Sequence, residues 1–169
     1  LDGAGVEKYE GAGRVTGPNS VEITDVDGKT QTVTAKTILL APGGRAWKPD
    51  IPGAELGITS DEALAFEHQP KRVVVIGGGY IAVEFAGIFQ GLGSKTDIVY
   101  RADLPLRGFD QEVRETVATN LGSRGTEIHA GANPKAVTKN DDGTLTLELD
   151  NGTMIECDCV MWATGRVPN

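Results

Sequence analysis

The sequence has little cysteine, histidine, aromatic residue or positive charge, and it has no long hydrophobic run. Aromatic residues make up 5% of its 169 positions, and there are two cysteines and two histidines. No apolar run approaches the ~18 residues that cross a bilayer, which argues against a membrane span. Because 16 Lys and Arg face 24 Asp and Glu, the net charge is −8. This balance argues against nucleic acids and anionic membranes as partners, since both attract an excess of basic residues.

The two cysteines, Cys157 and Cys159, are one residue apart. On a strand their side chains would point to the same face, with Cα atoms roughly 6.5–7 Å apart. That separation lies at or beyond the limit of disulfide geometry, so we expect two reduced, buried thiols. His68 and His129 stand alone in the sequence. We therefore expect no metal site.

The first part of the chain is typical of short β-strands. Its β-prone segments occupy residues 9–15, 21–24 and 30–34. The pair Asp27-Gly28 predicts a hairpin turn between the last two. The apolar run at residues 38–40 predicts a buried strand, and the Thr-Ser-Asp-Glu start of residues 59–66 predicts a short helix.

From Lys71 onward, strand-like and helix-like segments alternate, which predicts parallel strands joined by helices. The strands are expected at residues 73–76, 96–100 and 127–130, and the helices at residues 80–92 and 110–121. Apolar residues recur at helical spacing in the first helix, at Ile81, Phe85, Ile88, Phe89 and Leu92. Asp110 is the candidate N-cap of the second helix.

Three further β-prone segments follow, separated by Asn/Asp-Gly turns. They cover residues 136–139, 144–149 and 153–157. A last apolar strand ends at Thr164-Gly165. The predicted fold class is therefore α/β: a Rossmann-like parallel sheet from about Arg72 to Met161, with a three-stranded antiparallel β insertion packed on one face.

A glycine loop follows the first strand of this unit, as Gly77-x-Gly79-x-x-Ala82. Gly77 permits the tight turn, Gly79 lets the backbone approach a pyrophosphate, and Ala82 permits close contact of helix and sheet. The complete βαβ unit has close to the ~30 residues expected of a dinucleotide-binding motif. The alternative is a glycine turn without a ligand.

The next strand ends Val99-Tyr100-Arg101 and lacks the acidic residue that would bind the ribose of NAD. Arg101 and Arg107 supply positive charge instead, and a guanidinium matches a phosphate group bidentately. At ~1.5–3 kcal/mol per charge-assisted bond, two contacts separate NADPH from NADH by roughly 10² or more. We therefore predict NADPH as the cofactor, through its 2′-phosphate. The alternative is a pair of solvated surface arginines.

These motifs resemble the flavoprotein disulfide reductases, and within them the glutathione reductases. The resemblance rests on the long segment VVVIGGGYIAVEFAGIFQGLGSKTDIVYRADLPLRGFDQEVRE and on LLAPGGRAWKPDIPG, GITSDEAL and VMWATGRVPN. It implies three parts of the chain. They are a β-rich remnant of the FAD domain at residues 1–68, the NADPH-binding domain at residues 69–162, and a return into the FAD domain at residues 163–169.

The resemblance also implies roles for single residues. It places Gly78 and Ile81 in the pyrophosphate loop and Arg101 and Arg107 on the 2′-phosphate. The other implied positions are Tyr80 as a ring that gates the flavin, Glu84 beside the nicotinamide, Gly165 against the cofactor from the returning strand, and Gly13 at the FAD adenine. By residue type alone, Tyr80 would more often be a packing aromatic and Glu84 an exposed helix acid.

The same resemblance describes the parent enzyme as an NADPH-dependent, FAD-containing glutathione-disulfide reductase that works as a homodimer. We expect its FAD glycine loop and its Cys-x4-Cys pair before Leu1, and its dimerisation domain with a His-Glu pair after Asn169. The chain is then an incomplete, inactive portion that contains no catalytic residue of its own. We expect a soluble protein of a reducing compartment, either cytoplasm, plastid or mitochondrion, because the start of the chain shows no targeting pattern.

Other functions remain open. One is a standalone NADPH-binding module without turnover. Thioredoxin reductase and trypanothione reductase share the LRGFD region. A weaker alternative is an NADPH oxidase built on the same two-cofactor scaffold without the cysteine pair.

Overall fold

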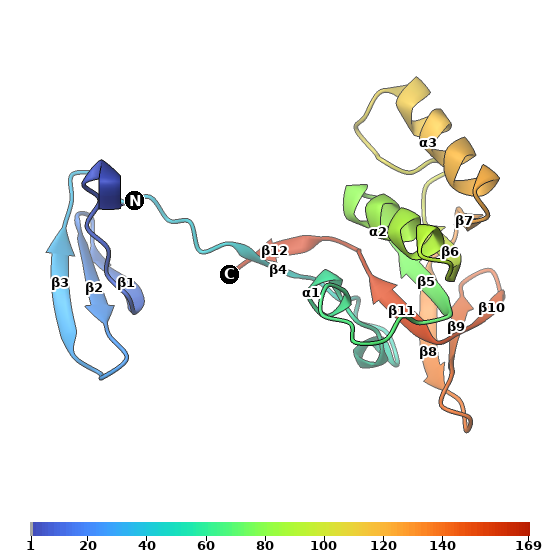
Figure 1. The fold of residues 1–169 in the computed structure, drawn as a ribbon, viewed down its shortest axis with the longest axis horizontal. Coiled ribbons are helices and arrows are strands. Elements are labelled where there is room, and N and C mark those ends of the chain that lie inside the picture. Colours follow the sequence, from blue (N-terminus) through green and yellow to red (C-terminus); the bar gives the residue numbers. More distant parts are fainter. Residues whose placement is uncertain (1) are drawn as a thin grey trace. The chain divides into compact units, whose positions relative to one another are not determined.

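Three short strands form a separate antiparallel sheet in the structure, a computed structural model that describes residues 2–169. A 3₁₀ helix, η1 (Asp2–Ala4), precedes them. The sheet has the order β1-β2-β3, formed by Ala12–Gly17, Ser20–Thr24 and Thr30–Thr34 (Figure 1). The predicted hairpin between β2 and β3 is confirmed, since Asp25 Oδ1 accepts bonds from the backbone N–H groups of Asp27 and Lys29, both at 2.9 Å.

The strand expected at residues 38–40 is wrong. These residues belong to no strand, and the side chains of Leu39 and Leu40 are 89% and 69% exposed. A strand needs a neighbour to accept and donate its backbone hydrogen bonds, and none of the described segments takes that position. The apolar composition of these residues does not show whether a neighbouring strand is present.

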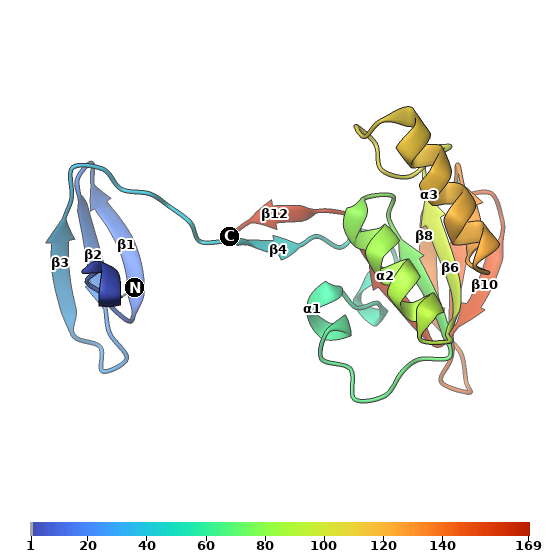
Figure 2. The same cartoon turned by 45° about the horizontal axis from the view of Figure 1, so that its top comes forward.

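The second unit, Gly43–Asn169, contains the predicted parallel sheet. Its strand order is β11-β5-β6-β7, and each neighbouring pair is parallel. The strands are β5 (Arg72–Ile76), β6 (Lys95–Tyr100), β7 (Glu127–Ala130) and β11 (Cys159–Trp162). Helix α2 (Tyr80–Gly91) joins β5 to β6, and α3 (Gln111–Ser123) joins β6 to β7 (Figure 2). The α/β fold class is confirmed.

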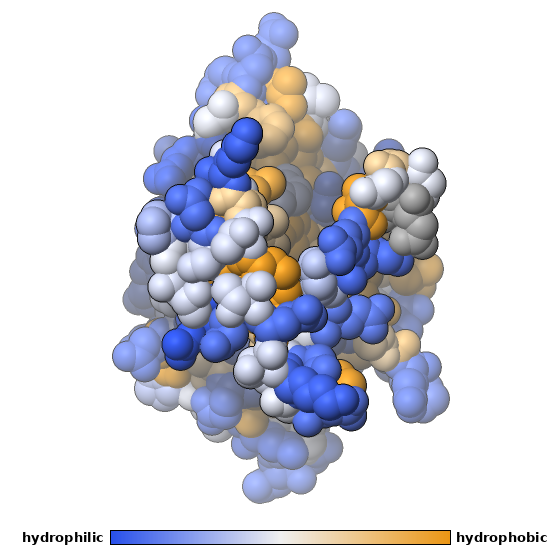
Figure 3. All heavy atoms as spheres, turned by 90° about the vertical axis from the view of Figure 1, so that its left-hand side faces the viewer, coloured by the Kyte–Doolittle hydropathy of each residue, from blue (hydrophilic) through white to orange (hydrophobic). Residues whose placement is uncertain are grey.

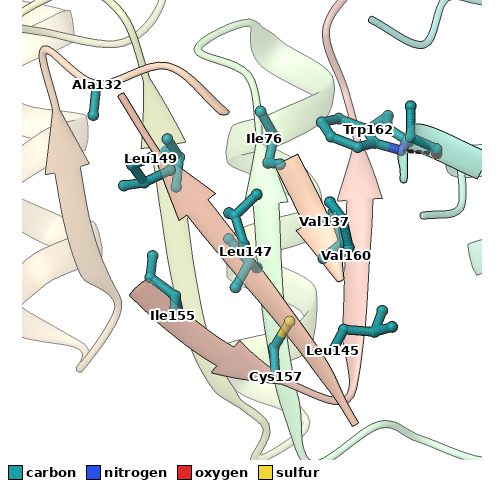
Figure 4. Packing of buried hydrophobic residues seen from close by; sticks show 13 residues of the cluster. Ile76, Ala132, Val137, Leu145, Leu147, Leu149, Ile155, Cys157, Val160 and Trp162 are labelled. Carbon is teal, nitrogen blue, oxygen red and sulfur yellow. Dashed lines mark hydrogen bonds between the residues drawn. The ribbon is translucent and has the colours of Figure 1, made fainter. Parts of the chain in front are cut away.

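The antiparallel insertion is confirmed as well. It has the order β10-β9-β8, formed by Pro134–Lys139 (β8), Leu145–Leu149 (β9) and Met154–Cys157 (β10). Its buried side chains meet one face of the parallel sheet, where Val137 and Leu147 pack in one core with Ile76 and Val160 (Figure 4). The helices cover the opposite face through a second core.

Helix α2 buries only part of the apolar face that the sequence predicts. Ile88 and Leu92 are 48% and 64% exposed. The buried positions are Ala82, Phe85, Ala86 and Phe89. Two alanines on the buried face let the helix axis lie close to the sheet, as predicted for Ala82, which is fully buried.

Several short elements precede β5. They are β4 (Gly44–Ala46), the 3₁₀ helix η2 (Ala54–Leu56) and the one-turn helix α1 (Ser60–Ala63). The predicted start of α1 is confirmed by a capping box between Thr59 and Glu62, although the helix ends earlier than expected. Strand β4 pairs with β12 (Arg166–Pro168), and neither strand was predicted.

The expectation that both cysteines share a strand face is wrong. Cys157 ends β10 and Cys159 begins β11, with a corner at Asp158 where the chain passes from one sheet to the other. Cys157 therefore lies in the core beneath the antiparallel sheet, and Cys159 lies in the core beneath the helices. Both are free and buried, as predicted.

We predict that neither thiol reacts with a disulfide reagent at pH 8 until the chain unfolds. Burial raises the pKa of both Cys157 and Cys159 to about 12. The thiolate is the reactive form, so labelling of the native chain should be on the order of 10³-fold slower than labelling in denaturant. Rapid reaction of the native protein with the disulfide reagent would contradict the burial of these thiols.

The same shift predicts a loss of stability at alkaline pH. The unfolded thiols ionise near pH 8.5, whereas the native thiols hold their protons up to about pH 12. The contribution of the protonated thiols to the free energy of unfolding is therefore complete below pH 8.5. It is lost as pH rises through that interval, by up to about 1.4 kcal/mol per pH unit for each thiol. Denaturant unfolding of wild type and a Cys157→Ala/Cys159→Ala variant at several pH values measures the difference in slope.

On the face drawn in Figure 3, hydrophobic residues form small, separate groups among hydrophilic ones. None of the helices in the described part of the chain has the length and apolar character needed to cross a membrane.

Candidate functional site

A cavity of about 600 Å³ lies at the carboxyl ends of the parallel strands. Gly77 follows β5, Arg101 follows β6, Ala132 follows β7 and Ala163 follows β11, and all four line the cavity. Strand β11 lies on the opposite side of β5 from β6, so the direction of chain progression reverses there. Ligands of open α/β sheets bind at such a reversal.

The glycine loop lines the cavity, and the surroundings of two of its glycines leave little or no room for a side chain. Gly77 has φ +139°, and a Cβ there would lie 2.2 Å from the backbone oxygen of Ala163. A Cβ on Gly78 would lie 3.1 Å from that of Tyr100. Gly79 is the N-cap of α2, provides no capping side chain and faces open space. The N-terminus of α2 is therefore open to an anion.

Arg101 and Arg107 both line the cavity and are both exposed. Neither guanidinium has a salt bridge or hydrogen-bond partner among residues 2–169. By contrast, the guanidinium of Arg72 holds Asp158 and Glu156. The two arginines are therefore available to a ligand.

The cavity combines these two cations with no carboxylate at all in its lining, although the chain carries a net charge of −8. Tyr100 takes the place of the expected acid, and burial raises the pKa of its phenol, which stays neutral at physiological pH. The site is therefore locally positive within an acidic chain. That arrangement favours a ligand with more than one phosphate group.

The structure brings together most of the residues predicted to bind the cofactor. Those that line the large cavity are Gly77, Gly78, Gly79, Tyr80, Arg101, Arg107 and Gly165. Tyr80 is 59% exposed and also lines an adjoining cavity of about 200 Å³, together with Ile81 and Arg166. Glu84 is exposed on α2 and lines neither cavity. Gly13 lies in β1, within the N-terminal unit.

Sequence reasoning missed several residues of the site. Trp47, 46% exposed, lines the cavity. Two hydrogen bonds fix its backbone: its backbone N–H donates to the backbone oxygen of Gly165 (2.9 Å), and its backbone oxygen accepts from the Thr164 hydroxyl (2.7 Å). No local signal marks it. Asn133, in the loop after β7, could have been found, because that loop follows a parallel strand at its carboxyl end.

No group of three potential ligands among His, Cys, Asp and Glu that could hold a metal ion occurs in the part of the chain that the structure describes. The sequence suggested that His129 stands alone, but in the structure it has a partner. Its Nε2 lies 2.8 Å from Oδ1 of Asp97, which is 8% exposed. The two residues lie on neighbouring strands, β7 and β6, which brings them together from 32 positions apart.

The whole chain, residues 1–169, matches the family model of the pyridine nucleotide-disulphide oxidoreductases. It is 47% identical over its full length to the chloroplastic/mitochondrial glutathione reductase of Pisum sativum, covering 30% of that protein. Over 80% of the chain it is 45% identical to the trypanothione reductase of Leishmania donovani, covering 28% of that protein.

A solved structure resembles the fold. The copper(II) complex of the HOCl-induced flavoprotein disulfide reductase RclA from Escherichia coli superimposes with a TM-score of 0.80 at 25% identity. The match covers 94% of this chain and 36% of that protein. The chain thus spans about a third of the length of the proteins that it matches.

Proposed function

Because this chain belongs to the pyridine nucleotide-disulphide oxidoreductase family, we propose that it is the NADPH-binding segment of an FAD-dependent disulfide reductase of the glutathione reductase type. One observation carries the choice of NADPH. Two partner-free arginines, Arg101 and Arg107, line a cavity that also contains an uncapped helix N-terminus and no carboxylate. This arrangement suits a dinucleotide with an additional 2′-phosphate.

The cavity suggests how the cofactor is divided among the residues. Arg101 and Arg107 bind the 2′-phosphate, and the backbone of Gly77, Gly78 and Gly79 receives the pyrophosphate at the start of α2. Tyr80 and Ile81 extend into the smaller cavity, which is the proposed direction of the nicotinamide. Gly165, which also lines the cavity directly before β12, would contact the cofactor from the returning segment.

Three further assignments rest on family resemblance rather than on geometry. Tyr80 would move aside as the nicotinamide enters, and its exposure leaves room for that motion. Glu84 would lie beside the nicotinamide, and Gly13 would contact the adenine of FAD. In the parent reaction NADPH supplies a hydride to FAD, and with one proton the electrons convert glutathione disulfide to two thiols through a cysteine pair outside this chain.

Glutathione disulfide is the proposed substrate of the parent enzyme, because a plant glutathione reductase matches over the full chain. Trypanothione disulfide is the second candidate, given the similarly high identity to a trypanothione reductase over a shorter part. The chain alone would bind NADPH without turnover. We propose a homodimer for the parent, and an organelle or the cytoplasm as its compartment.

The proposal predicts that NADPH binds this chain tens to thousands of times more tightly than NADH. Parallel titrations with both nucleotides, at one fixed and modest salt concentration, measure the ratio by quenching of tryptophan fluorescence. Equal affinities would contradict the 2′-phosphate assignment, and a folded chain that binds neither nucleotide would contradict the function itself. Circular dichroism of the same sample establishes that it is folded.

A further inference from the structure

We infer that Arg114, a third arginine outside the cavity, is a positioning residue that sets the preference for the 2′-phosphate. It would do so by fixing the loop that carries Arg101 and Arg107, without reaching the ligand. This inference rests on the proposed NADPH-binding function.

The side chain of Arg114 spans the middle of that loop. Its Nε donates to the backbone oxygen of Pro105 at 2.8 Å, and one terminal nitrogen donates to the backbone oxygen of Leu104 at 3.0 Å. The other terminal nitrogen lies 3.3 Å from Oε1 of Gln111. The planar guanidinium therefore grips two successive carbonyl groups, halfway between Arg101 and Arg107 in the sequence.

The loop needs such support because it contains neither helix nor strand. Leu106 adopts φ +56° and is the non-glycine residue found at positive φ in the described part of the chain. A branched residue holds this conformation only where its surroundings impose it. Its N–H donates to the oxygen of Gly78 at 2.6 Å, which ties the arginine loop directly to the glycine loop.

Arg114 acts on the ligand only through this loop. It is absent from the lining of both cavities, and its donors are directed at the protein. It projects from the first turns of α3, whose N-cap Asp110 accepts bonds from the N–H groups of Glu112 and Val113. The N-terminal end of α3 is thus fixed by its cap. Because Arg114 lies at this end, its bonds restrain the loop against a fixed part of the helix.

A loop held in this way places both guanidinium groups before the ligand arrives. Releasing it should weaken mainly the contacts with the 2′-phosphate, because the side chain of Arg114 bonds neither the glycine loop nor α2. NADH lacks the 2′-phosphate, so its affinity should not change. This difference separates a positioning role from a general contribution to folding.

The test compares Arg114→Met and Arg114→Lys with Arg124→Met, which removes an arginine from the C-cap at the other end of the same helix. Each variant is titrated with NADPH and with NADH. Arg114→Met should bind NADPH about tenfold more weakly and NADH unchanged, and Arg114→Lys should fall between, because one ammonium cannot hold two carbonyls in a fixed fork. Arg124→Met should match wild type.

A second background distinguishes positioning from direct contact. In a chain with Arg101→Ala and Arg107→Ala, adding Arg114→Met should cause no further loss of NADPH affinity. A further loss there would mean that Arg114 touches the phosphate, which overturns the inference. Parallel weakening of NADPH and NADH would overturn it too, in favour of a purely structural role.

Limited trypsin digestion provides a readout without any ligand. Cleavage after Arg101 and Arg107 should be faster in Arg114→Met than in Arg124→Met, and equal rates would contradict the inference. If wild type shows no preference for NADPH, the proposed function fails. If wild type prefers NADPH and Arg114→Met keeps that preference, only the role of Arg114 fails.

Discussion

Replacing Arg101 and Arg107 together by alanine will remove most of the preference for NADPH over NADH. Both side chains line the cavity and have no partner among the described residues, so their loss leaves no buried group unpaired. A charge-assisted bond contributes ~1.5–3 kcal/mol, so losing both should weaken NADPH roughly 10²-fold or more. Affinity for NADH should stay within about threefold, because its adenosine ribose carries no 2′-phosphate.

The matched control removes two positive charges elsewhere in the same unit, with Arg124→Ala and Lys139→Ala. Both residues are exposed and neither lines the cavity. At 0.1 M salt, screening limits the range over which exposed charges interact to about 10 Å. This control should therefore retain the preference for NADPH. An equal loss of NADPH preference in the control would mean that overall charge causes the effect. An unchanged ratio of NADPH to NADH affinity in the double alanine variant would mean that both arginines are solvated surface residues without a role in binding.

Substituting alanine for Gly77 will both destabilise the chain and abolish tight binding. The new Cβ would lie 2.2 Å from the oxygen of Ala163, at a φ of +139° that an L-residue rarely adopts. Strained backbone costs about 1–3 kcal/mol, and displacing β11 from β5 adds to it, so we expect about 3–5 kcal/mol in total. Thermal unfolding should show a midpoint about 10 °C lower.

Gly79→Ala, two residues along, separates folding from binding. Gly79 has φ −86°, and a Cβ there meets nothing within 4 Å. The midpoint should therefore remain within about 2 °C of wild type. The methyl group would occupy the approach to the N-terminus of α2, so NADPH and NADH should both weaken about tenfold, with their ratio preserved. A change in the ratio would place the pyrophosphate somewhere else.

Together these variants test two parts of one site. Under the proposed function, the arginine loop would distinguish the two nucleotides, and the glycine loop would bind the pyrophosphate that they share. The cavity joins them because β5 and β6 are neighbours and end at the same edge of the sheet. Their order along the chain therefore becomes proximity in space, which is the general logic of ligand sites on parallel sheets.

The local elements of this fold could be predicted from the sequence alone. Asp110 was identified as an N-cap, and it accepts two backbone bonds at the start of α3. Residues 30–34 and 127–130 were predicted as strands with the bounds that the structure gives them. The glycine loop and the acid-free end of β6 were also apparent. Such features depend on backbone preferences and hydrogen bonds within a few residues, so neighbouring letters carry the information.

The tertiary structure decided what depends on distant residues. It leaves residues 38–40 outside any strand, pairs β4 with β12 across about 120 positions, and sends Cys157 and Cys159 into different cores. It also adds Trp47 to the cavity and places Arg114 across the arginine loop. Strand pairing and burial depend on which distant segments meet in the folded chain. They therefore cannot be predicted from a short stretch of sequence. The residue types proposed for the site could thus be identified from the sequence, whereas their arrangement in space depends on how the sheets pack.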